Sequence, residues 1–366
     1  MMPTVHARHD KSHHSGTVAS GTPLVIGHRG ACGYVPEHTL TSYFIAIQQG
    51  ADFVEPDLVM TQDRVLVARH ENEIGATTNV ADHPEFATRR KAKIIDGDAT
   101  EGWFTEDFTL AELKTLRARE RIADLRPENV RFDGQFEIAT LEEILALVRA
   151  AHSARSVRAQ LLGVPEPAPI GVYVETKHPS YFSKLGLAME EALVAALARW
   201  DFTGPDAPVF LQSFEVGNLK ALRGMTDLPI VQLVEAGGQP YDFTASSDRR
   251  TYADLMTPAG LAEIARYAQV IGVDKTLIIP RNADDSLARP TTLVADAHAQ
   301  GLKVHGWTFR AENAFLPRKF RSSSARARRG NLAAEIGAYL ATGMDGFFTD
   351  QPDLGVRGRD AFVAMR

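Results

Sequence analysis

Two carboxylates two residues apart, Glu55 and Asp57, are the first candidates for chemistry in this chain of 366 residues. They lie in an apolar run that is typical of a β-strand, and the two-residue period of a strand puts both side chains on one face. Two converging carboxylates repel each other unless a cation neutralises them, so a hard divalent metal is their natural partner. On spacing alone, an acid pair of the glycosidase kind and a structural salt-bridge pair remain as alternatives.

Further charged residues stand where other apolar runs end. His28 ends the first run and is followed by Arg29, and Glu175 ends a later run with Lys177 two residues beyond it. Core positions rarely collect so much charge. Carboxylates suit a metal, Arg and Lys suit a phosphate group, and paired histidines suit an acid and a base, so the pattern indicates phosphate chemistry.

A second histidine, His70, ends the run Val65–His70, which four residues separate from the strand of Glu55 and Asp57. Four residues cannot make a parallel crossover, so this run should fold back as an antiparallel hairpin. A two-residue turn, at Gln62-Asp63 or at Asp63-Arg64, puts His70 on the face of the carboxylates, whereas a three-residue turn puts it on the other face. We expect one of the two-residue turns.

The elements that must position these residues alternate along the chain. Short apolar runs are separated by amphipathic stretches such as Leu40–Gln49, Leu187–Trp200 and Leu293–Gln300, which are predicted to be helices. This alternation is typical of a mainly parallel sheet with helices outside it. With the hairpin strand set apart, eight strands remain, which predicts an α/β fold of the TIM (β/α)8 barrel type. These strands are Leu24–His28, Phe53–Val59, Gly171–Glu175, Val209–Gln212, Ile230–Val234, Val270–Val273, Val304–Thr308 and Gly346–Thr349.

Two segments exceed what such a barrel needs. Residues of about 76–135 carry many charges, Asp-Gly pairs and one helical pattern at Leu110–Arg121, and we expect an insertion after the hairpin of the second strand that covers one rim. Residues of about 310–332 form a basic loop, for which a solvated surface is favoured over contact with anionic lipid. We expect a flexible polar tail over residues 1–21 and a single barrel domain over residues 22–356.

The composition excludes several classes of protein. With 44% hydrophobic and 23% charged residues, the chain is neither disordered nor fibrous, and its one cysteine excludes an internal disulfide. A formal net charge of −6 gives no general attraction to nucleic acid or to anionic membranes. No apolar run reaches the ~18 residues of a membrane span. The first residues carry no export signal, so we expect a cytoplasmic protein for the chain as given, or a periplasmic or secreted one if a signal has been removed.

Taken together, the motifs resemble those of the glycerophosphodiester phosphodiesterases of the longer bacterial type. The resemblance runs in order from residue 24 to about residue 354, and its segments are specific as a set rather than singly. They are Gly27-His28-Arg29-Gly30, Pro36-Glu37-His38-Thr39, Glu55-Pro56-Asp57-Leu58-Val59-Met60-Thr61, Ala68-Arg69-His70-Glu71 leading to Thr77-Thr78, Glu175-Thr176-Lys177, Gln212-Ser213-Phe214, Gly306-Trp307-Thr308 and Asp345-Gly346-Phe347-Phe348-Thr349-Asp350.

The resemblance implies a TIM-barrel enzyme that releases sn-glycerol 3-phosphate and an alcohol from a glycerophosphodiester. It implies one divalent metal ion, Ca²⁺ or Mg²⁺, and an internal attack of the glycerol 2-hydroxyl on phosphorus, giving a cyclic phosphate that water then opens. It assigns Glu55, Asp57 and Glu175 to the metal, His28 and His70 to general acid–base catalysis, and Arg29 and Lys177 to the phosphate.

The chain departs from the family pattern at two positions. His38 replaces the usual asparagine of Pro-Glu-Asn-Thr, so we assign Glu37 a supporting rather than a ligating role, as we do Gln212. Pro56 separates the two carboxylates and removes a backbone N–H from the strand, which predicts a local irregularity there.

Three further residues have two interpretations each. Trp307 and Phe214 are candidates for the substrate pocket, with a core role as the alternative. Cys32 lies close to His28 in the sequence, but we interpret it as a small apolar filler rather than a nucleophile, because no third orienting group is evident.

Two other functions remain open. The same chemistry on an intact lysophospholipid, as in a lysophospholipase D, would need an apolar groove beside the site. A catalytically silent phosphate-binding barrel is the other, since a fold alone does not secure a function. The leading hypothesis requires a small-molecule glycerophosphodiester as partner, with no nucleic acid and no stable membrane insertion, and the sequence leaves the oligomeric state unknown.

Overall fold

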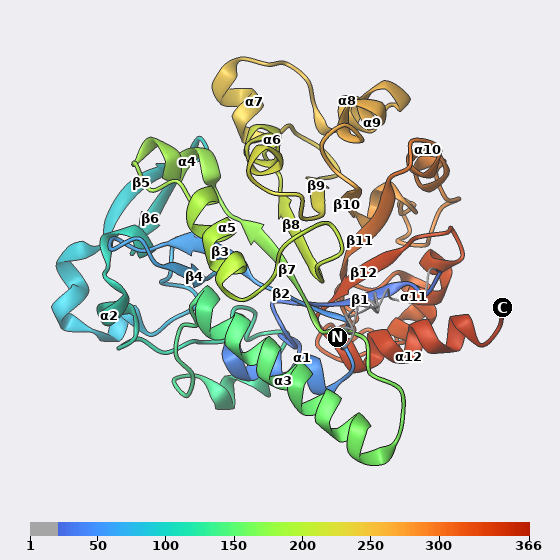
Figure 1. Ribbon diagram of the computed structural model, residues 1–366, viewed down its shortest axis with the longest axis horizontal. Helices are drawn as coiled ribbons and strands as arrows, with labels where there is room; N and C mark the ends of the chain where they lie inside the picture. Colours follow the sequence, from blue (N-terminus) through green and yellow to red (C-terminus); the bar gives the residue numbers. More distant parts are fainter. Residues whose placement is uncertain (1–20) are drawn as a thin grey trace, which may run out of the picture.

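Eight parallel strands close into a barrel in the computed structural model, which describes residues 21–366 (Figure 1). Strand β1 pairs with β2 on one side and with β12 on the other. From β7 to β12, each strand pairs with the next one in the sequence. The barrel closes because β2 and β3 both pair with β7. The predicted barrel is thereby confirmed. Its strands are β1 Leu24–His28, β2 Phe53–Glu55 with β3 Asp57–Met60, β7 Gly171–Thr176, β8 Val209–Ser213, β9 Ile230–Val234, β10 Val270–Asp274, β11 Lys303–Phe309 and β12 Gly346–Thr349.

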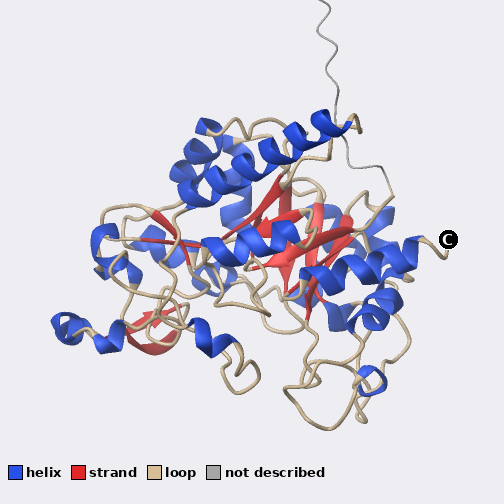
Figure 2. Ribbon diagram, turned by 90° about the horizontal axis from the view of Figure 1, so that it is seen from below, coloured by secondary structure: helices blue, strands red, loops and turns tan. Residues whose placement is uncertain are grey.

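Helices surround the barrel on its outer side, so that the strands occupy the centre of the molecule (Figure 2). The long helix α3 begins where the Thr140 side chain accepts a hydrogen bond from the Glu143 backbone N–H and ends at Gly163, whose φ is 64°. The helices are α1 Leu40–Gln48, α2 Leu110–Leu113, α3 Leu141–Leu162, α4 Pro179–Lys184, α5 Glu190–Arg199, α6 Val216–Met225, α7 Tyr241–Ser246, α8 Tyr252–Leu255, α9 Pro258–Ile264, α10 Leu293–Ala299, α11 Leu332–Leu340 and α12 Pro352–Val363. None of the helices in residues 21–366 is both long enough and apolar enough to cross a membrane.

Aromatic side chains fill the inside of the barrel beneath the charged residues. The ring of Tyr173 lies 4.8 Å from that of Phe210 and 4.9 Å from that of Phe348, measured between centroids. Tyr173 precedes Glu175 by two residues on β7, so both point inward and the ring lies one layer deeper. This apolar layer forms a dry floor under the carboxylates.

The strand that carries the two acidic residues is interrupted at Pro56, as the missing N–H predicts. β2 ends at Glu55 and β3 begins at Asp57, yet both parts keep one register along β7, with Phe53 opposite Gly171 and Asp57 opposite Glu175. The two-residue spacing therefore survives the break, and both carboxylates still point into the barrel.

The predicted two-residue turn of the hairpin is wrong. Strand β4, Leu66–Ala68, pairs antiparallel with β3 and places Leu58 opposite Ala68 and Met60 opposite Leu66. The Thr61 N–H then donates to the Val65 carbonyl at 3.0 Å, which leaves the three residues 62–64 in the turn. His70 nevertheless reaches the site, because β4 ends at Ala68 and the chain bends before His70. Alternation along a strand does not govern a residue beyond its end.

Two predicted helices are also shorter than expected. Of the helix predicted over Leu110–Arg121, only α2 forms, since Ala118 instead makes a strand-like bridge with Thr78. The helix predicted over Leu187–Trp200 begins only at Glu190, four residues after a turn at Gly186 with a φ of 71°.

The segment of residues 76–135 contains a hairpin that the sequence analysis did not identify. Strands β5 Lys91–Ile95 and β6 Asp98–Gly102 are joined by Asp96 and Gly97, whose φ values of 49° and 95° suit a tight hairpin turn. An Asp-Gly pair between strands is the sequence signal for this turn. The hairpin lies to one side of the barrel, at the left in Figure 1. Of the predicted tail, residues 1–20 lie outside the described residues.

A glycine in the loop after β1 gives a first prediction, on stability. Gly30 has a φ of 86°, and an added Cβ would lie 2.4 Å from Ser42 Oγ and 2.5 Å from the Ser42 carbonyl carbon. Gly134 has a φ of 78° with nothing within 4 Å of such a Cβ. We expect Gly134→Ala to lower the free energy of unfolding by ~1–2 kcal/mol, the cost of the left-handed backbone, and Gly30→Ala by a further ~1–3 kcal/mol for overpacking. Urea unfolding measures both, and equal losses would contradict the packing argument.

Candidate active site

A cavity of about 280 Å³ opens at the C-terminal ends of the barrel strands. Every residue predicted for the site lines it except Glu37, and the cavity brings in further residues that the prediction lacks, among them Arg310, Glu235 and Thr308. A larger cavity of about 410 Å³ lies at the opposite end of the barrel, where Leu24 and Phe210 line it, and it contains none of the predicted residues. The charged cavity is therefore the candidate site.

Three buried carboxylates meet in this cavity. Oxygen atoms of Glu55, Asp57 and Glu175 all lie within 4.8 Å of one another. The strand register explains the convergence, because Glu55 lies opposite His28 on β1 and Asp57 lies opposite Glu175 on β7. Neighbouring strands of one barrel thus deliver the three groups side by side.

Hydrogen bonds from neutral groups hold the first two carboxylates. Glu55 accepts from the backbone N–H of Arg29 at 2.7 Å and from Gln212 Nε2 at 3.1 Å. Asp57 Oδ2 accepts from His38 Nε2 at 2.9 Å, while His38 Nδ1 bonds the Tyr43 hydroxyl at 2.7 Å. The histidine that replaces the usual asparagine therefore supplies an N–H donor to a carboxylate of the cluster.

Mutual repulsion and burial separate the pKa values of the three carboxylates. Burial, followed by the charges of Asp57 and Glu175, raises the pKa of Glu55 well above its ordinary range. Burial raises the pKa of Glu175 to about 8, against the attraction of Lys177, whose Nζ lies 2.8 Å away. Burial would raise the pKa of Asp57 as well, but Lys177 and His70 hold it low. Burial and mutual repulsion therefore outweigh the nearby positive charges at Glu55 and Glu175, and favour the protonated form of both.

The donor set fits a hard divalent cation. All three groups offer carboxylate oxygens, and Asp57 Oδ1 is buried with no hydrogen-bond partner among the described residues. Ca²⁺ and Mg²⁺ prefer oxygen ligands of this kind.

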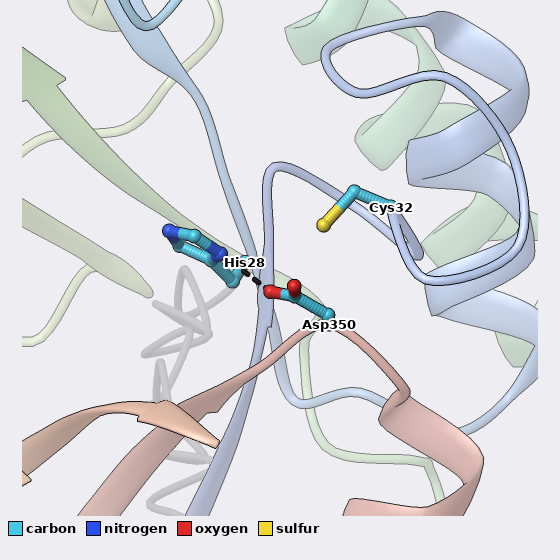
Figure 3. A group of neighbouring side chains, drawn as sticks. All are labelled: His28, Cys32 and Asp350. Atoms are coloured by element: carbon cyan, nitrogen blue, oxygen red, sulfur yellow. Dashed lines mark hydrogen bonds and ion pairs between the residues drawn. The ribbon is translucent and has the colours of Figure 1, made fainter. Parts of the chain in front are cut away.

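His28 is held at the edge of the cavity by an aspartate that directly follows the last strand, β12. Its Nδ1 lies 2.7 Å from Asp350 Oδ1 (Figure 3). Burial, followed by the charge of Arg29, lowers the pKa of His28 to about 4, so the ring is neutral at neutral pH. A carboxylate can only accept, so the proton resides on Nδ1 and the lone pair of Nε2 is free.

Two arginines hold Asp350 in turn. Its Oδ2 accepts from Arg126 Nη2 at 2.5 Å and from Arg310 Nε at 3.0 Å. Burial would raise the pKa of Asp350, but these guanidinium groups lower it well below its ordinary range. The aspartate is therefore ionised and fixed from both sides.

His70 lines the same cavity as His28. Its Nδ1 bonds Glu71, and its Nε2 lies 3.4 Å from Lys177 Nζ. Burial, followed by the charges of Arg29 and Lys177, lowers its pKa well below the ordinary value. Each histidine thus has a carboxylate behind one nitrogen and presents the other to the cavity.

Glu37 lies behind the cavity rather than in it. Its carboxylate accepts from Arg29 Nη1 at 2.9 Å and from Arg121 Nη2 at 2.6 Å. Glu37 therefore orients the Arg29 guanidinium. Glu37 is held in turn by Arg121, a residue of the insertion.

Two aromatic side chains form one wall of the cavity. The rings of Phe214 and Trp307 meet edge to face at 5.9 Å, and Trp307 Nε1 donates to the Gly272 carbonyl at 3.0 Å.

Cys32 is buried close to His28 and Asp350, and its sulfur points toward the Asp350 carboxylate (Figure 3). Burial raises the pKa of its thiol well above the ordinary value, so the group stays protonated.

The sequence analysis missed four residues that contact the site: Glu71, Asp350, Arg310 and Arg126. Asp350 directly follows β12. A charged residue at the end of a barrel strand is the signal that identified His28, so the same signal could have identified Asp350 from the sequence. Arg126 lies in the insertion, where no strand period indicates which side chain turns inward.

The profile of the Glycerophosphoryl diester phosphodiesterase family matches residues 28–354. Glycerophosphodiester phosphodiesterase GDPD6 of Arabidopsis thaliana is 34% identical over 343 residues, which cover 90% of this chain and 83% of the relative. A glycerophosphodiester phosphodiesterase of Bacillus subtilis is 30% identical over 337 residues, covering 90% and 84%.

A solved structure has the same fold. A phosphodiesterase of Oleispira antarctica in complex with the product sn-glycerol-3-phosphate superposes with a TM-score of 0.58 at 19% identity, over 93% of this chain and 97% of its own. At this identity the superposition supports the barrel fold alone.

A second prediction concerns pH and metal binding. In the metal-free protein the pKa of Glu175 is about 8 rather than 4.5. The folded state keeps a proton that the unfolded chain loses, so this group's contribution to stability falls as the pH rises from about 4.5 to about 8. Cation binding displaces that proton. We expect Ca²⁺ or Mg²⁺ to raise Tm more at pH 8 than at pH 6 and to release protons on binding, as calorimetry in two buffers would measure.

Glu175→Gln is the matched control for this prediction. It preserves the shape of the side chain but has no proton to release, so both effects should shrink. Equal Tm shifts at the two pH values, without proton release in the unsubstituted protein, would contradict the argument.

Proposed function

This chain belongs to the glycerophosphoryl diester phosphodiesterase family, and from that premise we propose that its barrel cavity hydrolyses glycerophosphodiesters to sn-glycerol 3-phosphate and an alcohol. The chain is thus an enzyme, a phosphoric diester hydrolase. The observation that carries the proposal is one cavity in which three buried carboxylates, two histidines and two cationic side chains converge. No single strand supplies this set, so chance clustering is a poor explanation.

The carboxylates of Glu55, Asp57 and Glu175 would hold one divalent cation, for which we propose Ca²⁺ or Mg²⁺ on the basis of the all-oxygen donor set. A bound cation of this kind neutralises phosphate charge and lowers the pKa of a hydroxyl group. Gln212 and His38 support the cluster by donating to two of its members.

Arg29 and Lys177 would bind the phosphoryl oxygens, since both line the cavity and carry full positive charge. Arg310 lines the same cavity and uses only its Nε on Asp350, which makes it a third candidate. Trp307 and Phe214 would pack against the glycerol carbons. A cavity of about 280 Å³ suits the small glycerol phosphate half of a deacylated lipid, which favours such substrates over intact lysophospholipids.

The two histidines would move the protons. In the first step the glycerol 2-hydroxyl attacks phosphorus and one neutral histidine accepts its proton at Nε2. The other histidine, which would take up a proton when the anionic phosphodiester binds beside it, donates that proton to the departing alcohol as its bond to phosphorus breaks. In the second step water opens the cyclic phosphate while the histidines exchange these roles. Asp350 and Glu71 support both steps, because each fixes the ring whose other nitrogen faces the reacting atoms.

The roles of the metal ligands and histidines can be tested by substitution. We expect Glu175→Ala to remove most metal-dependent activity and His28→Ala or His70→Ala to lower kcat/KM by roughly 10²–10⁴-fold, the usual worth of a positioned acid or base. The assay is release of sn-glycerol 3-phosphate from glycerophosphocholine, with and without EDTA. Cys32→Ala is the control, because its thiol lies close to His28 and Asp350 but does not line the cavity and moves no proton. Full activity of Glu175→Ala would refute the metal assignment.

The internal nucleophile can be tested by the choice of substrate. A glycerophosphocholine analogue without the 2-hydroxyl should be cleaved very poorly, because no group would remain to attack phosphorus, although its phosphate and leaving group are unchanged. Bis(p-nitrophenyl) phosphate should be poor for the same reason. Transient cyclic glycerophosphate, followed by phosphorus NMR, should appear only with the natural substrate. Rapid hydrolysis of the deoxy analogue would mean that water attacks directly.

A further inference from the structure

Arg126 belongs to the insertion, yet its guanidinium is buried behind the cavity. Its side chain is only 6% exposed. Nε donates to Glu312 at 2.7 Å, Nη1 donates to the Cys32 carbonyl at 3.0 Å, and Nη2 donates to Asp350 at 2.5 Å. One fork of donors therefore joins the insertion to the loops after β1, β11 and β12.

The contact with Asp350 leads directly to a catalytic side chain. Asp350 divides its two oxygens, with Oδ1 on His28 and Oδ2 on the two arginines. A carboxylate held at both oxygens cannot rotate, and a histidine bonded to it through Nδ1 keeps its ring direction and its tautomer.

We propose that Arg126 is a positioning residue for the reaction: through Asp350 it fixes the ring of His28, so that the insertion completes the catalytic apparatus of the barrel. The proposal rests on the function proposed above. It assigns the insertion a part in the chemistry besides covering a rim.

Arg126 differs from Arg310 in a way that makes the proposal testable. Arg310 lines the cavity and can touch substrate, whereas Arg126 is absent from the cavity lining. Loss of Arg126 should therefore lower kcat and leave KM nearly unchanged, because it changes the direction of a proton acceptor and no substrate contact.

The burial of the contact explains why an arginine is needed. Without Arg126, a buried carboxylate oxygen of Asp350 would lose a charged donor, which is costly, and the group would turn toward another one. A lysine supplies the charge but not the rigid fork that reaches Glu312, Asp350 and a carbonyl at once. We therefore expect a lysine to restore part of the function.

The experiment compares Arg126→Met, Arg126→Lys and Asp350→Asn in the full chain, with Arg89→Met as the matched control. Arg89 also lies in the insertion and forms a bidentate pair with Glu112, but it does not line the cavity. We expect Arg126→Met to lower kcat roughly 10- to 100-fold with KM within about 3-fold, since a slightly misplaced catalytic group costs about this much. The kcat of Arg126→Lys should lie between those of Arg126→Met and the unsubstituted protein. The kcat of Asp350→Asn should fall at least as far as that of Arg126→Met, and Arg89→Met should keep the unsubstituted kcat.

A second readout needs no substrate. In ¹⁵N-histidine-labelled protein, the Nδ1–H of His28 bonded to Asp350 should give a slowly exchanging ring signal that Asp350→Asn removes. Arg126→Met should shift or broaden it, and Arg89→Met should not. If the unsubstituted protein cleaves no glycerophosphodiester, the proposed function fails while this signal still tests the contact.

Two outcomes would overturn the proposal. One is a folded Arg126→Met protein with unchanged kcat and an unchanged His28 signal. If that variant does not fold, Arg126→Lys decides: an unchanged kcat overturns the proposal, and a lowered kcat at constant KM supports it.

Discussion

The repulsion among three buried carboxylates is the constraint on which the rest of the site depends. Glu55, Asp57 and Glu175 approach within 4.8 Å in a place where water cannot screen them. Burial, with the charge of Asp57, raises the pKa of Glu175 to about 8 even though Lys177 pairs with it. A divalent cation bound by the three carboxylates would balance their charge.

The neutral donors around the cluster follow from this constraint. Backbone and amide N–H groups bond Glu55, and His38 bonds Asp57, so geometry is fixed without cancelling the charge that a cation needs. Two full positive charges also border the cluster, since Lys177 Nζ lies 2.8 Å from Glu175 and Arg29 Nε lies 3.5 Å from Asp57. The side chains of Lys177 and Arg29 also line the cavity, where their positive charges suit an anionic ligand.

The barrel and the insertion divide the work between them. The barrel strands present the three carboxylates of the cavity, and the aromatic layer around Tyr173 lies beneath them. The insertion reaches behind two of those groups, with Arg121 on Glu37 and Arg126 on Asp350. Each arginine bonds a carboxylate that in turn bonds another side chain, and neither arginine lines the cavity itself.

The sequence by itself determined the eight strands and the convergence of Glu55, Asp57 and Glu175, because strand alternation and the ends of parallel strands are local properties of the backbone. It also placed the break at Pro56, which follows from one missing N–H. Tertiary structure alone decided how His70 arrives, since a three-residue turn and a bend after Ala68 override the alternation. It likewise decided that Arg126 meets Asp350, 224 residues further along the chain. No period in the sequence encodes such a contact, because the path of an irregular loop depends on the surface on which it packs.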